Sequence, residues 1–458
     1  MYRNEDIEKI EANIDKIKND STVEYKTHFE PTIKEISKVY NAIKNYIINK
    51  KKVVYGGFAQ NLLIITKNPD DGFYKEVDGA YYNWPDIADL EFYSPTPIED
   101  MIDLCNELHK KGFKHVQGKE GVHEGTYKIF VNFINYCDIS YTPKNMYDNI
   151  PTIDINGVRC SHPHYMMVDA FRILTDPMTS YWRIEKPLKR FQKLIRYYPI
   201  DRINNKIEIK DNSKEKEEVL KYIRKRFIHN SKLIVVGFYG YNYYVSKDSE
   251  KNKIKTPYYE LITTDIENDG KKILLKLLKN YGKKITIREF YPFVSFLDKR
   301  VEYYYDNELI LKLYSNNDRC IVYNFSETKK THFGTYNLVF MYLLFNYFNF
   351  FANRDKPNTD LFRQLISNFH KIRKNYLTTH NKTVMDKSPF QDFTLKCYGF
   401  PVDQLRKSFL EGLEKIKKKE KMKFTYDPSK KIKTIPKLKI DNISGSEITS
   451  KKDYIIHK

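Results

Sequence analysis

The sequence predicts an α/β (α+β) fold with two successive domains, each built from a mixed sheet and helices. Three observations carry this prediction. A β-branched run at residues 53–54 leads through a glycine turn into an apolar helical pattern. Strands of alternating polar and apolar residues then take turns with helical segments. The same series begins again near residue 231 in the same order, which is typical of an internal repeat.

Residues 1–50 predict an N-terminal helical arm of two helices. Apolar residues recur at helical spacing in both halves, and Pro31 suits the first turn of the second helix. The recurring residues are Ile7, Ile10, Ile14, Ile17, Ile33, Ile36, Val39, Tyr40, Ile43 and Ile47. We expect the arm to pack against the following sheet or against a partner chain.

The segment VVYGGFAQNLLI predicts a strand, a tight turn and the start of a helix. Gly56 and Gly57 allow the backbone to approach a phosphate, and the helix behind them points free N–H groups at the same place. Glycine pairs are also common between a strand and a helix simply because the turn requires them. A purely structural role for the two glycines therefore stays open.

Two carboxylates follow on one strand, in the segment PDIADLEFYSPTP. Residues two apart share a face of a strand, so Asp89 and Glu91 point together while Leu90 and Phe92 point to the core. Such a pair is tolerated chiefly when a cation lies between the carboxylates. Asp86 faces the other way in a regular strand and is a second choice.

A third acid, Asp138, lies in the alternating segment FINYCDISYTP. A helix at residues 98–108 and a hairpin at residues 117–133 separate it from the acid pair, as a mixed sheet requires. If the two acidic strands are neighbours, the three carboxylates form one cluster. Such a cluster can hold two Mg²⁺ or Mn²⁺ ions about 4 Å apart, the arrangement used in nucleotidyl transfer.

The glycine turn, the acid pair and the third acid together resemble the nucleotidyltransferase fold of the polymerase β superfamily. Within it, the chain resembles the poly(A) polymerase catalytic subunits of giant nucleocytoplasmic large DNA viruses. The resemblance implies that Asp89, Glu91 and Asp138 are catalytic metal ligands and that Gly56 and Gly57 form the turn beside the nucleotide. Position 57 is more often Ser in this motif, so a hydroxyl contact to the triphosphate is not expected there.

The resemblance implies a template-independent enzyme that transfers AMP from ATP to an RNA 3′ end. Asp138 would also deprotonate or orient the 3′-hydroxyl that attacks the α-phosphate. A non-catalytic RNA-binding or processivity subunit is the alternative, and so is another nucleotidyltransferase such as a tRNA-modifying one. We expect RNA and ATP as partners, a homodimer as one form of the enzyme, and the host cytoplasm or viral factory, with virion packaging, as its location.

A basic helix closes the expected catalytic domain, residues 51–200. It carries Arg183, Lys186, Lys189 and Arg190. A solvated helix face explains such a set equally well, but the resemblance favours Arg183 and Lys186 as nucleotide-binding contacts to the triphosphate.

The second half predicts a charged connecting helix at residues 201–232 and a degenerate nucleotidyltransferase-like domain at residues 233–410. In the repeated series Glu260 keeps one acid, Ile262 takes the place of its partner, and Lys312 takes the place of the third acid. A site short of two ligands holds no catalytic metal pair, so we expect this domain to shape an RNA channel. Chance alternation is the alternative.

The formal net charge of +20 predicts a polyanionic partner, with nucleic acid favoured over a membrane. A lysine-rich tail at residues 411–458 is typical of disordered, RNA-binding segments, although such charge also serves solubility. The apolar run at residues 336–351 is too short to span a bilayer and predicts a buried helix. No signal peptide is expected.

The five cysteines show no zinc-ligand or disulfide spacing, and we expect buried thiols in a reducing compartment.

Overall fold

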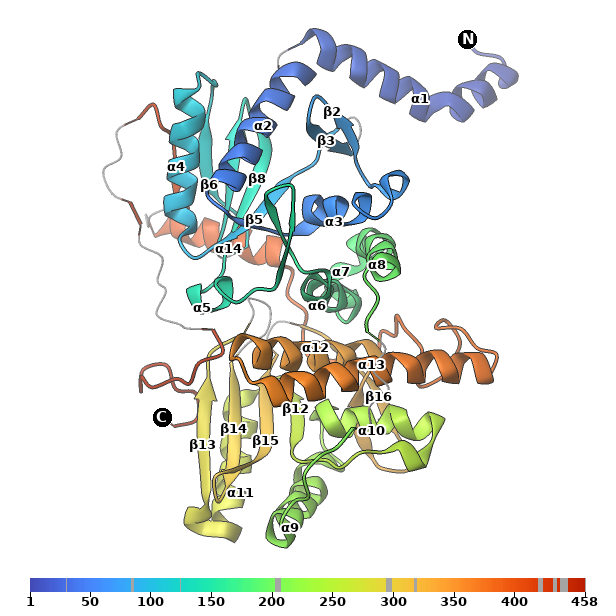
Figure 1. Ribbon diagram of the computed structural model, residues 1–458, viewed down its shortest axis with the longest axis vertical. Helices are drawn as coiled ribbons and strands as arrows, with labels where there is room; N and C mark the ends of the chain where they lie inside the picture. The colour runs from blue at the N-terminus through green and yellow to red at the C-terminus, as the bar shows by residue number, and fades with distance from the viewer. Residues whose placement is uncertain are drawn as a thin grey trace. The chain divides into compact units, whose positions relative to one another are not determined.

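A computed structural model of the chain describes residues 1–29, 31–83, 86–123, 125–201, 207–293, 299–316, 319–418, 423–430, 435–436 and 444–457. The chain divides into two compact units. The first unit contains residues 1–141, 151–162 and 408–439, and the second contains residues 142–150, 163–407 and 440–458. Each unit has its own mixed sheet (Figure 1).

The first unit is built on an eight-stranded sheet with the strand order β19-β6-β7-β8-β5-β1-β10-β9. Its strands are β1 (Val53–Val54), β5 (Leu90–Ser94), β6 (Gln117–Glu120), β7 (Thr126–Val131), β8 (Ile134–Tyr141), β9 (Thr152–Ile155), β10 (Val158–Ser161) and β19 (Thr425–Tyr426). A small second sheet contains β2 (Lys75–Val77), β3 (Ala80–Asn83) and β4 (Asp86–Ile87). The helices are α1 (Asn4–His28), α2 (Ile33–Asn49), α3 (Gly56–Ile65), α4 (Pro97–Lys110) and α14 (Gln404–Lys417).

The two helices of the N-terminal arm differ in what they bury. Helix α2 begins with a capping box between Thr32 and Glu35, and it buries Ile36, Tyr40 and Ile43. Helix α1 has no buried side chain. The expected packing of the arm against the sheet therefore holds for α2, whereas for α1 packing against a partner chain stays a prediction.

The second unit has an eight-stranded sheet with the order β13-β14-β15-β12-β11-β17-β16-β18. Its strands are β11 (Ile234–Val236), β12 (Tyr259–Thr263), β13 (Ile285–Phe290), β14 (Arg300–Tyr305), β15 (Glu308–Ser315), β16 (Ile321–Ser326), β17 (Thr331–Gly334) and β18 (Cys397–Tyr398). Its longer helices are α6 (Pro163–Leu174), α8 (Glu185–Tyr197), α9 (Lys214–Ile223), α10 (Gly237–Asp248), α11 (Ile266–Tyr281), α12 (Tyr336–Ala352) and α13 (Lys356–Thr379).

Seven strands have the same order and the same directions in the two sheets. In both, the first strand pairs antiparallel with the second and parallel with the last, and the second pairs parallel with the end of the following hairpin. The turn after the second strand is also shared. Ser94 Oγ donates to Asp100 in one unit, and Thr263 Oγ1 donates to Asp269 in the other. The prediction of two mixed α/β sheets in series is confirmed.

The boundaries of the units differ from the expected domains. Helix α6 packs against α12 and belongs to the second unit. The N-terminal part of the first unit therefore ends at residue 162, whereas the expected catalytic domain ends near residue 200. The expected tail is divided as well. Strand β19 pairs with β6 of the first sheet, whereas residues 444–457 run beside β13.

The end of the chain is held by one buried carboxylate. Glu289 accepts hydrogen bonds from the backbone N–H groups of Ile456 at 2.8 Å and His457 at 2.9 Å. The Ile456 side chain also fills the space above Gly270, where a Cβ atom would lie 2.1 Å from it. The described parts of the lysine-rich tail are therefore ordered, in contrast to the expectation of disorder.

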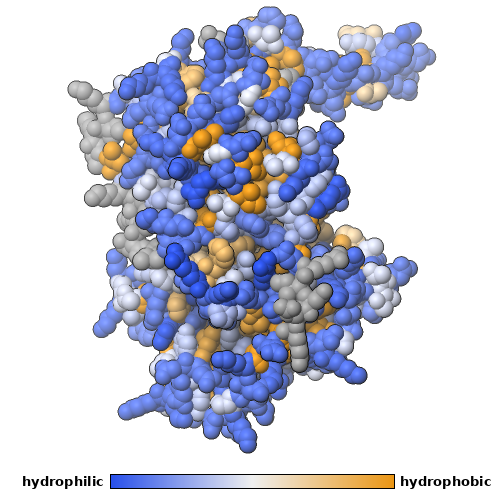
Figure 2. All heavy atoms as spheres, in the orientation of Figure 1, coloured by the Kyte–Doolittle hydropathy of each residue, from blue (hydrophilic) through white to orange (hydrophobic). Residues whose placement is uncertain are grey.

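Helix α12 is the apolar segment noted in the sequence. Its side chains from Tyr336 to Phe345 are all buried, as expected of a core helix. Across the described helices, none combines the length and the apolar character that crossing a membrane requires. On the face in Figure 2 the surface is mainly hydrophilic, with apolar side chains gathered in small patches.

The cysteine prediction is wrong at two positions. Cys320 and Cys397 form a disulfide that joins the start of β16 to β18 across 77 residues of sequence. Cys105, Cys137 and Cys160 are buried free thiols, as expected. Sequence spacing could not reveal the disulfide because the two cysteines meet only through strand pairing.

Candidate functional site

Two of the predicted acids lie side by side on the first sheet. Strands β5 and β8 are parallel neighbours, and Glu91 is in register with Asp138. Neighbouring strands are about 4.8 Å apart, and residues in register project from the same face. Asp89 directly precedes β5, is exposed, and is two residues from Glu91.

The buried thiol of Cys137 lies between its neighbour Asp138 and the core of the first unit. Burial raises the pKa of Cys137 well above its ordinary value, and the charges of Asp138, Asp89 and Glu91 raise it further. The core partners of the acids, Leu90 and Ile139, are fully buried, which fixes the direction of the acids away from the core.

The glycine turn makes room for a carboxylate. Gly56 has φ +68°, and a Cβ atom at this position would lie 1.7 Å from Glu91 Oε2. The Gly57 N–H donates to the same Oε2 at 3.0 Å. We predicted that these glycines let the backbone approach a phosphate. In the structure the space over Gly56 is filled by Glu91, held at the N-terminus of α3.

Asp138 is held by two residues that the sequence reasoning missed. Lys128 Nζ lies 2.8 Å from Asp138 Oδ1 and 2.6 Å from Oδ2, and Asn135 Nδ2 donates to Oδ1 at 3.0 Å. Lys128 lies on β7 directly opposite Asp138. The alternation of the hairpin places Lys128 on a strand, but only the register identifies its partner.

The donor set fits a hard divalent cation. All three acids offer carboxylate oxygens, which are the ligands that Mg²⁺ and Mn²⁺ prefer. Within the described ranges, no three His, Cys, Asp or Glu side chains are already arranged around one ion position. Asp138 is directed to Lys128, whose ammonium group supplies positive charge at that carboxylate.

An aromatic pair borders the acids. Tyr55 stacks on Tyr93 with ring centroids 4.1 Å apart, and the Tyr55 hydroxyl lies 2.6 Å from Ser140 Oγ. Tyr93 and Ser140 are two residues beyond Glu91 and Asp138 on their strands, so they lie on the same face. The sequence analysis did not select these residues.

The remaining predicted residues lie elsewhere. Asp86 is on β4 and forms an ion pair with Lys26 at 3.0 Å. Arg183 and Lys186 belong to the second unit, in the turn before α8 and in its first part. Arg183 lies over the ring of Trp182, 5.5 Å from its centroid, and Trp182 is exposed. The acids and these two basic residues are thus on different compact units.

The second sheet shows which residues correspond to the acids. Gly237 has φ +58°, and a Cβ atom there would lie 2.2 Å from Glu260 Oε1. This repeats the relation between Gly56 and Glu91, so Glu260 corresponds to Glu91. The position of Asp89 is then taken by Tyr258. We expected Glu260 to correspond to Asp89 and Ile262 to Glu91. This alignment is wrong by two residues, because Glu260 itself corresponds to Glu91.

A buried polar network takes the place of the acid cluster in the second unit. Glu260 Oε2 accepts from the Tyr314 hydroxyl at 2.7 Å and from Asn346 Nδ2 at 2.8 Å. Lys312, in register with Glu260, donates to Asn346 Oδ1 at 3.1 Å. Burial lowers the pKa of Lys312, and the charge of Glu260 opposes this shift. The hydrogen bonds to Glu260 thus engage Oε2, whereas Oε1 is buried without a hydrogen-bond partner.

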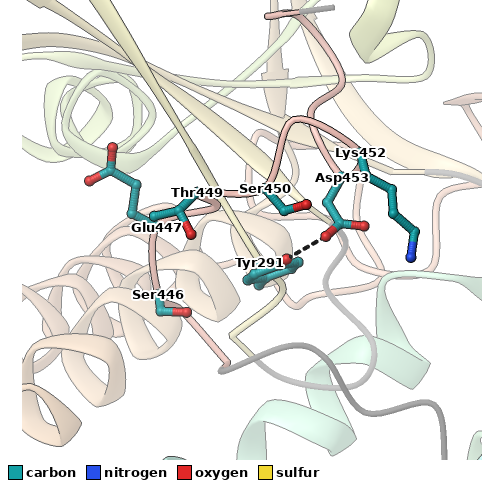
Figure 3. A pocket seen from close by; sticks show the side chains of 7 residues that line it. All are labelled: Tyr291, Ser446, Glu447, Thr449, Ser450, Lys452 and Asp453. Carbon is teal, nitrogen blue, oxygen red and sulfur yellow. Dashed lines mark hydrogen bonds between the residues drawn. The ribbon is translucent and has the colours of Figure 1, made fainter.

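A pocket of about 340 Å³ lies in the second unit (Figure 3). Tyr291 forms one side of it, and its hydroxyl donates to Asp453 Oδ2 at 2.9 Å. The rest is lined by Ser446, Glu447, Thr449, Ser450 and Lys452. None of the predicted site residues lines this pocket.

Comparison with known proteins places the chain in a family. The family model of the poly(A) polymerase catalytic subunit matches residues 41–180. The model for the C-terminal part of the APMV poly(A) polymerase catalytic subunit matches residues 192–458.

Relatives and a solved structure agree with these matches. The poly(A) polymerase catalytic subunit of Acanthamoeba polyphaga mimivirus is 31% identical over 502 residues, covering 100% of this chain and 84% of the relative. That of African swine fever virus (isolate Pig/Kenya/KEN-50/1950) is 28% identical over 177 residues, 37% of this chain and 35% of the relative. The crystal structure of the Megavirus polyadenylate synthase has a TM-score of 0.91 at 30% identity, covering 99% of this chain and 94% of that one. The chain therefore belongs to the poly(A) polymerase catalytic subunits of giant viruses and is a nucleotidyltransferase.

Proposed function

We propose that this chain is a template-independent poly(A) polymerase that adds AMP from ATP to the 3′ end of viral mRNA in the host cytoplasm. The observation that carries the proposal is the register of Glu91 with Asp138 beside the Gly56 turn. It brings two carboxylate residues together on a sheet face where the second unit has the buried network of Glu260, Lys312 and Asn346.

The residues have separate roles in the proposed reaction. The 3′ oxygen of the RNA attacks the α-phosphorus of ATP, and pyrophosphate leaves with the electrons of the broken P–O bond. Asp138 deprotonates or orients the attacking hydroxyl. Glu91 is held against the N-terminus of α3 by the Gly57 N–H and lies in register with Asp138.

Asp89, Glu91 and Asp138 would hold two Mg²⁺ or Mn²⁺ ions. When bound, these ions would supply charge that stabilises the attacking and leaving oxygens. The carboxylate donor set supports this assignment. We also propose Arg183 and Lys186 as triphosphate contacts, and the exposed Trp182 beside Arg183 as a surface on which an RNA base stacks.

We propose that the second unit is a degenerate copy of the first. The common order of seven strands supports a duplication, and so does the repeated relation between a left-handed glycine and a glutamate. Because Lys312 replaces the third acid, this copy would shape the RNA path without binding catalytic ions.

A homodimer is a further part of the proposal. The buried helix α12 is not available for self-association, whereas α1 exposes Ile7, Ile10, Ile14 and Ile17. These residues follow a heptad spacing, which suits a helix pair between two copies of the chain. Sedimentation at micromolar concentration tests this point. A monomer both alone and with RNA would contradict it, and Ile10→Lys with Ile14→Lys should shift a dimer to monomer.

Primer extension with the purified protein tests the catalytic proposal. We expect long adenylate tails with ATP and Mg²⁺ or Mn²⁺ and poor incorporation of the other three nucleotides. Asp138→Ala should abolish incorporation while RNA binding stays within a few-fold. Incorporation at the wild-type rate by this variant would show that the site is misassigned. RNA binding without any incorporation by the wild type would favour the non-catalytic subunit.

A further inference from the structure

Four charged side chains form a row across the first sheet, with like charges next to each other. Lys119 on β6 pairs with Lys128 on β7, Lys128 pairs with Asp138 on β8, and Asp138 pairs with Glu91 on β5. Residues in register share one face of a sheet. The two acids are therefore adjacent on one side of the row, and the two lysines are adjacent on the other.

The corresponding row of the second sheet alternates in sign. It reads Arg288, Glu302, Lys312 and Glu260. Each charge there has an opposite charge as its cross-strand neighbour, so the row compensates itself. In the first row, by contrast, Lys128 is the cross-strand cation that lies next to the pair of adjacent acids.

From this arrangement we propose that Lys128 is a positioning residue that holds Asp138 in the metal-free enzyme and competes with divalent cations for its carboxylate. The inference rests on the proposed function of Asp138 as a metal ligand. Lys128 Nζ contacts both carboxylate oxygens, at 2.6 and 2.8 Å, so it covers the lone pairs that an ion would use. The side chain of Lys128 is 32% exposed and that of Asp138 is 19% exposed, so solvent screens this ion pair only partly.

The proposal has a physical consequence for both states of the enzyme. Without an ion, Lys128 offsets the repulsion between Asp138 and its neighbour Glu91. With an ion bound at Asp138, the ammonium group should move away from the carboxylate, because the divalent charge repels Lys128 and takes lone pairs that Lys128 otherwise uses. Lys128 would then be free to turn toward the triphosphate. In the metal-free enzyme, the contact of Lys128 with Asp138 lowers the affinity of the site for metal and stabilises the fold.

Metal affinity can be measured without turnover. Free Mn²⁺ is followed by electron paramagnetic resonance during titration of the full chain in the absence of nucleotide. Because an ion must displace the charge-assisted hydrogen bonds from Lys128 to Asp138, we expect Lys128→Met to bind Mn²⁺ about tenfold more tightly than the wild type. Lys128→Arg keeps the cation and should stay within about twofold of the wild type.

The chain offers a matched control in Lys119→Met. Lys119 lies in the same row, one strand further from Asp138, and its Nζ lies over the Phe130 ring, 5.1 Å from the centroid. The variant removes the same charge without freeing Asp138, so its Mn²⁺ affinity should change less than twofold. Equal tightening in Lys119→Met and Lys128→Met would overturn the proposal, and so would unchanged or weaker binding by Lys128→Met.

A second measurement uses the wild-type chain and needs no variant at Lys128. Amine acetylation is mapped by mass spectrometry with and without saturating Mn²⁺. Release from Asp138 should raise the labelling of Lys128 several-fold and leave Lys119 unchanged. Unchanged labelling of Lys128 at saturation would contradict the proposal.

The Mn²⁺ titrations distinguish a wrong metal site from a wrong role of Lys128. If Mn²⁺ binds the wild type and Asp138→Ala equally, or binds neither the wild type nor Lys128→Met, the metal site of the proposed function is wrong. If binding depends on Asp138 but not on Lys128, only the role of Lys128 is wrong.

Discussion

The two sheets place charged residues at the same positions and use them for different ends. In the first unit Glu91 and Asp138 are adjacent, and Lys128 lies beside them. In the second unit Lys312 separates Glu260 from Glu302, and all three side chains are at least nine-tenths buried. The first row leaves two acids side by side, whereas the charges of the second alternate in sign. One fold can thus carry a reactive cluster or a structural network, depending on the order of charges across four strands.

The largest expected effect separates the two corresponding glutamates. Glu91→Gln removes a proposed metal ligand and should lower the rate of AMP incorporation by about 1,000-fold or more, about 4 kcal/mol of barrier. Glu260→Gln should leave the rate within about twofold, because Glu260 bonds to Tyr314 and Asn346 inside the second unit. Primer extension on both purified variants measures this. Equal losses would remove the functional distinction between the sheets.

The next effect concerns stability and pH in the second unit. Burial alone raises the pKa of Glu302, but the charges of Arg300 and Lys312 and the hydrogen bonds from Tyr304 and Arg300 outweigh it and hold the pKa below its usual value of 4.5. Because the folded pKa is lowered, this stability is present above pH 4.5 and is lost as pH falls through the folded pKa.

Glu302→Gln tests the contribution of the Glu302 charge to stability. At pH 7 it leaves Arg300 buried without its carboxylate and should cost about 3 kcal/mol of unfolding free energy. Urea unfolding from pH 7 to pH 4 should show a larger loss for the wild type on acidification than for the variant. A variant that is as stable as the wild type at pH 7 would contradict the network as a source of stability.

A pair of glycine variants compares the two turns directly. An alanine at Gly56 or Gly237 meets a glutamate carboxylate and has an unfavourable positive φ, so each should cost about 2 kcal/mol of unfolding free energy. Only Gly56→Ala displaces a proposed catalytic residue. We expect similar thermal shifts for both variants but an activity loss of about 100-fold for Gly56→Ala alone. Activity loss in Gly237→Ala at a temperature where it is folded would show that the second turn also takes part.

The smallest expected effect tests the basic residues of the second unit. Lys186→Met should raise the KM for ATP about fivefold with little change in kcat, because it removes one charge that we propose to contact the triphosphate. Lys189→Met is the control, since Lys189 pairs with Glu185 on the exposed face of α8. Steady-state kinetics on both variants test whether Lys186 contacts the triphosphate. An unchanged KM in Lys186→Met would indicate that this face of α8 is only solvent-exposed.

Local patterns of the sequence determined the strand, glycine turn and helix at residues 53–65, the shared face of Asp89 and Glu91, and the repeat of the whole series. These features depend on spacing along one segment, where periods of two and 3.6 residues are enough. Only the tertiary structure decided that Lys128 opposes Asp138, that Glu91 fills the space over Gly56, that Glu260 corresponds to Glu91, and that Cys320 meets Cys397. The physical reason is register. A strand may slide by two residues and keep its buried face, so the partners across a sheet follow from packing of the whole unit and not from the segment itself.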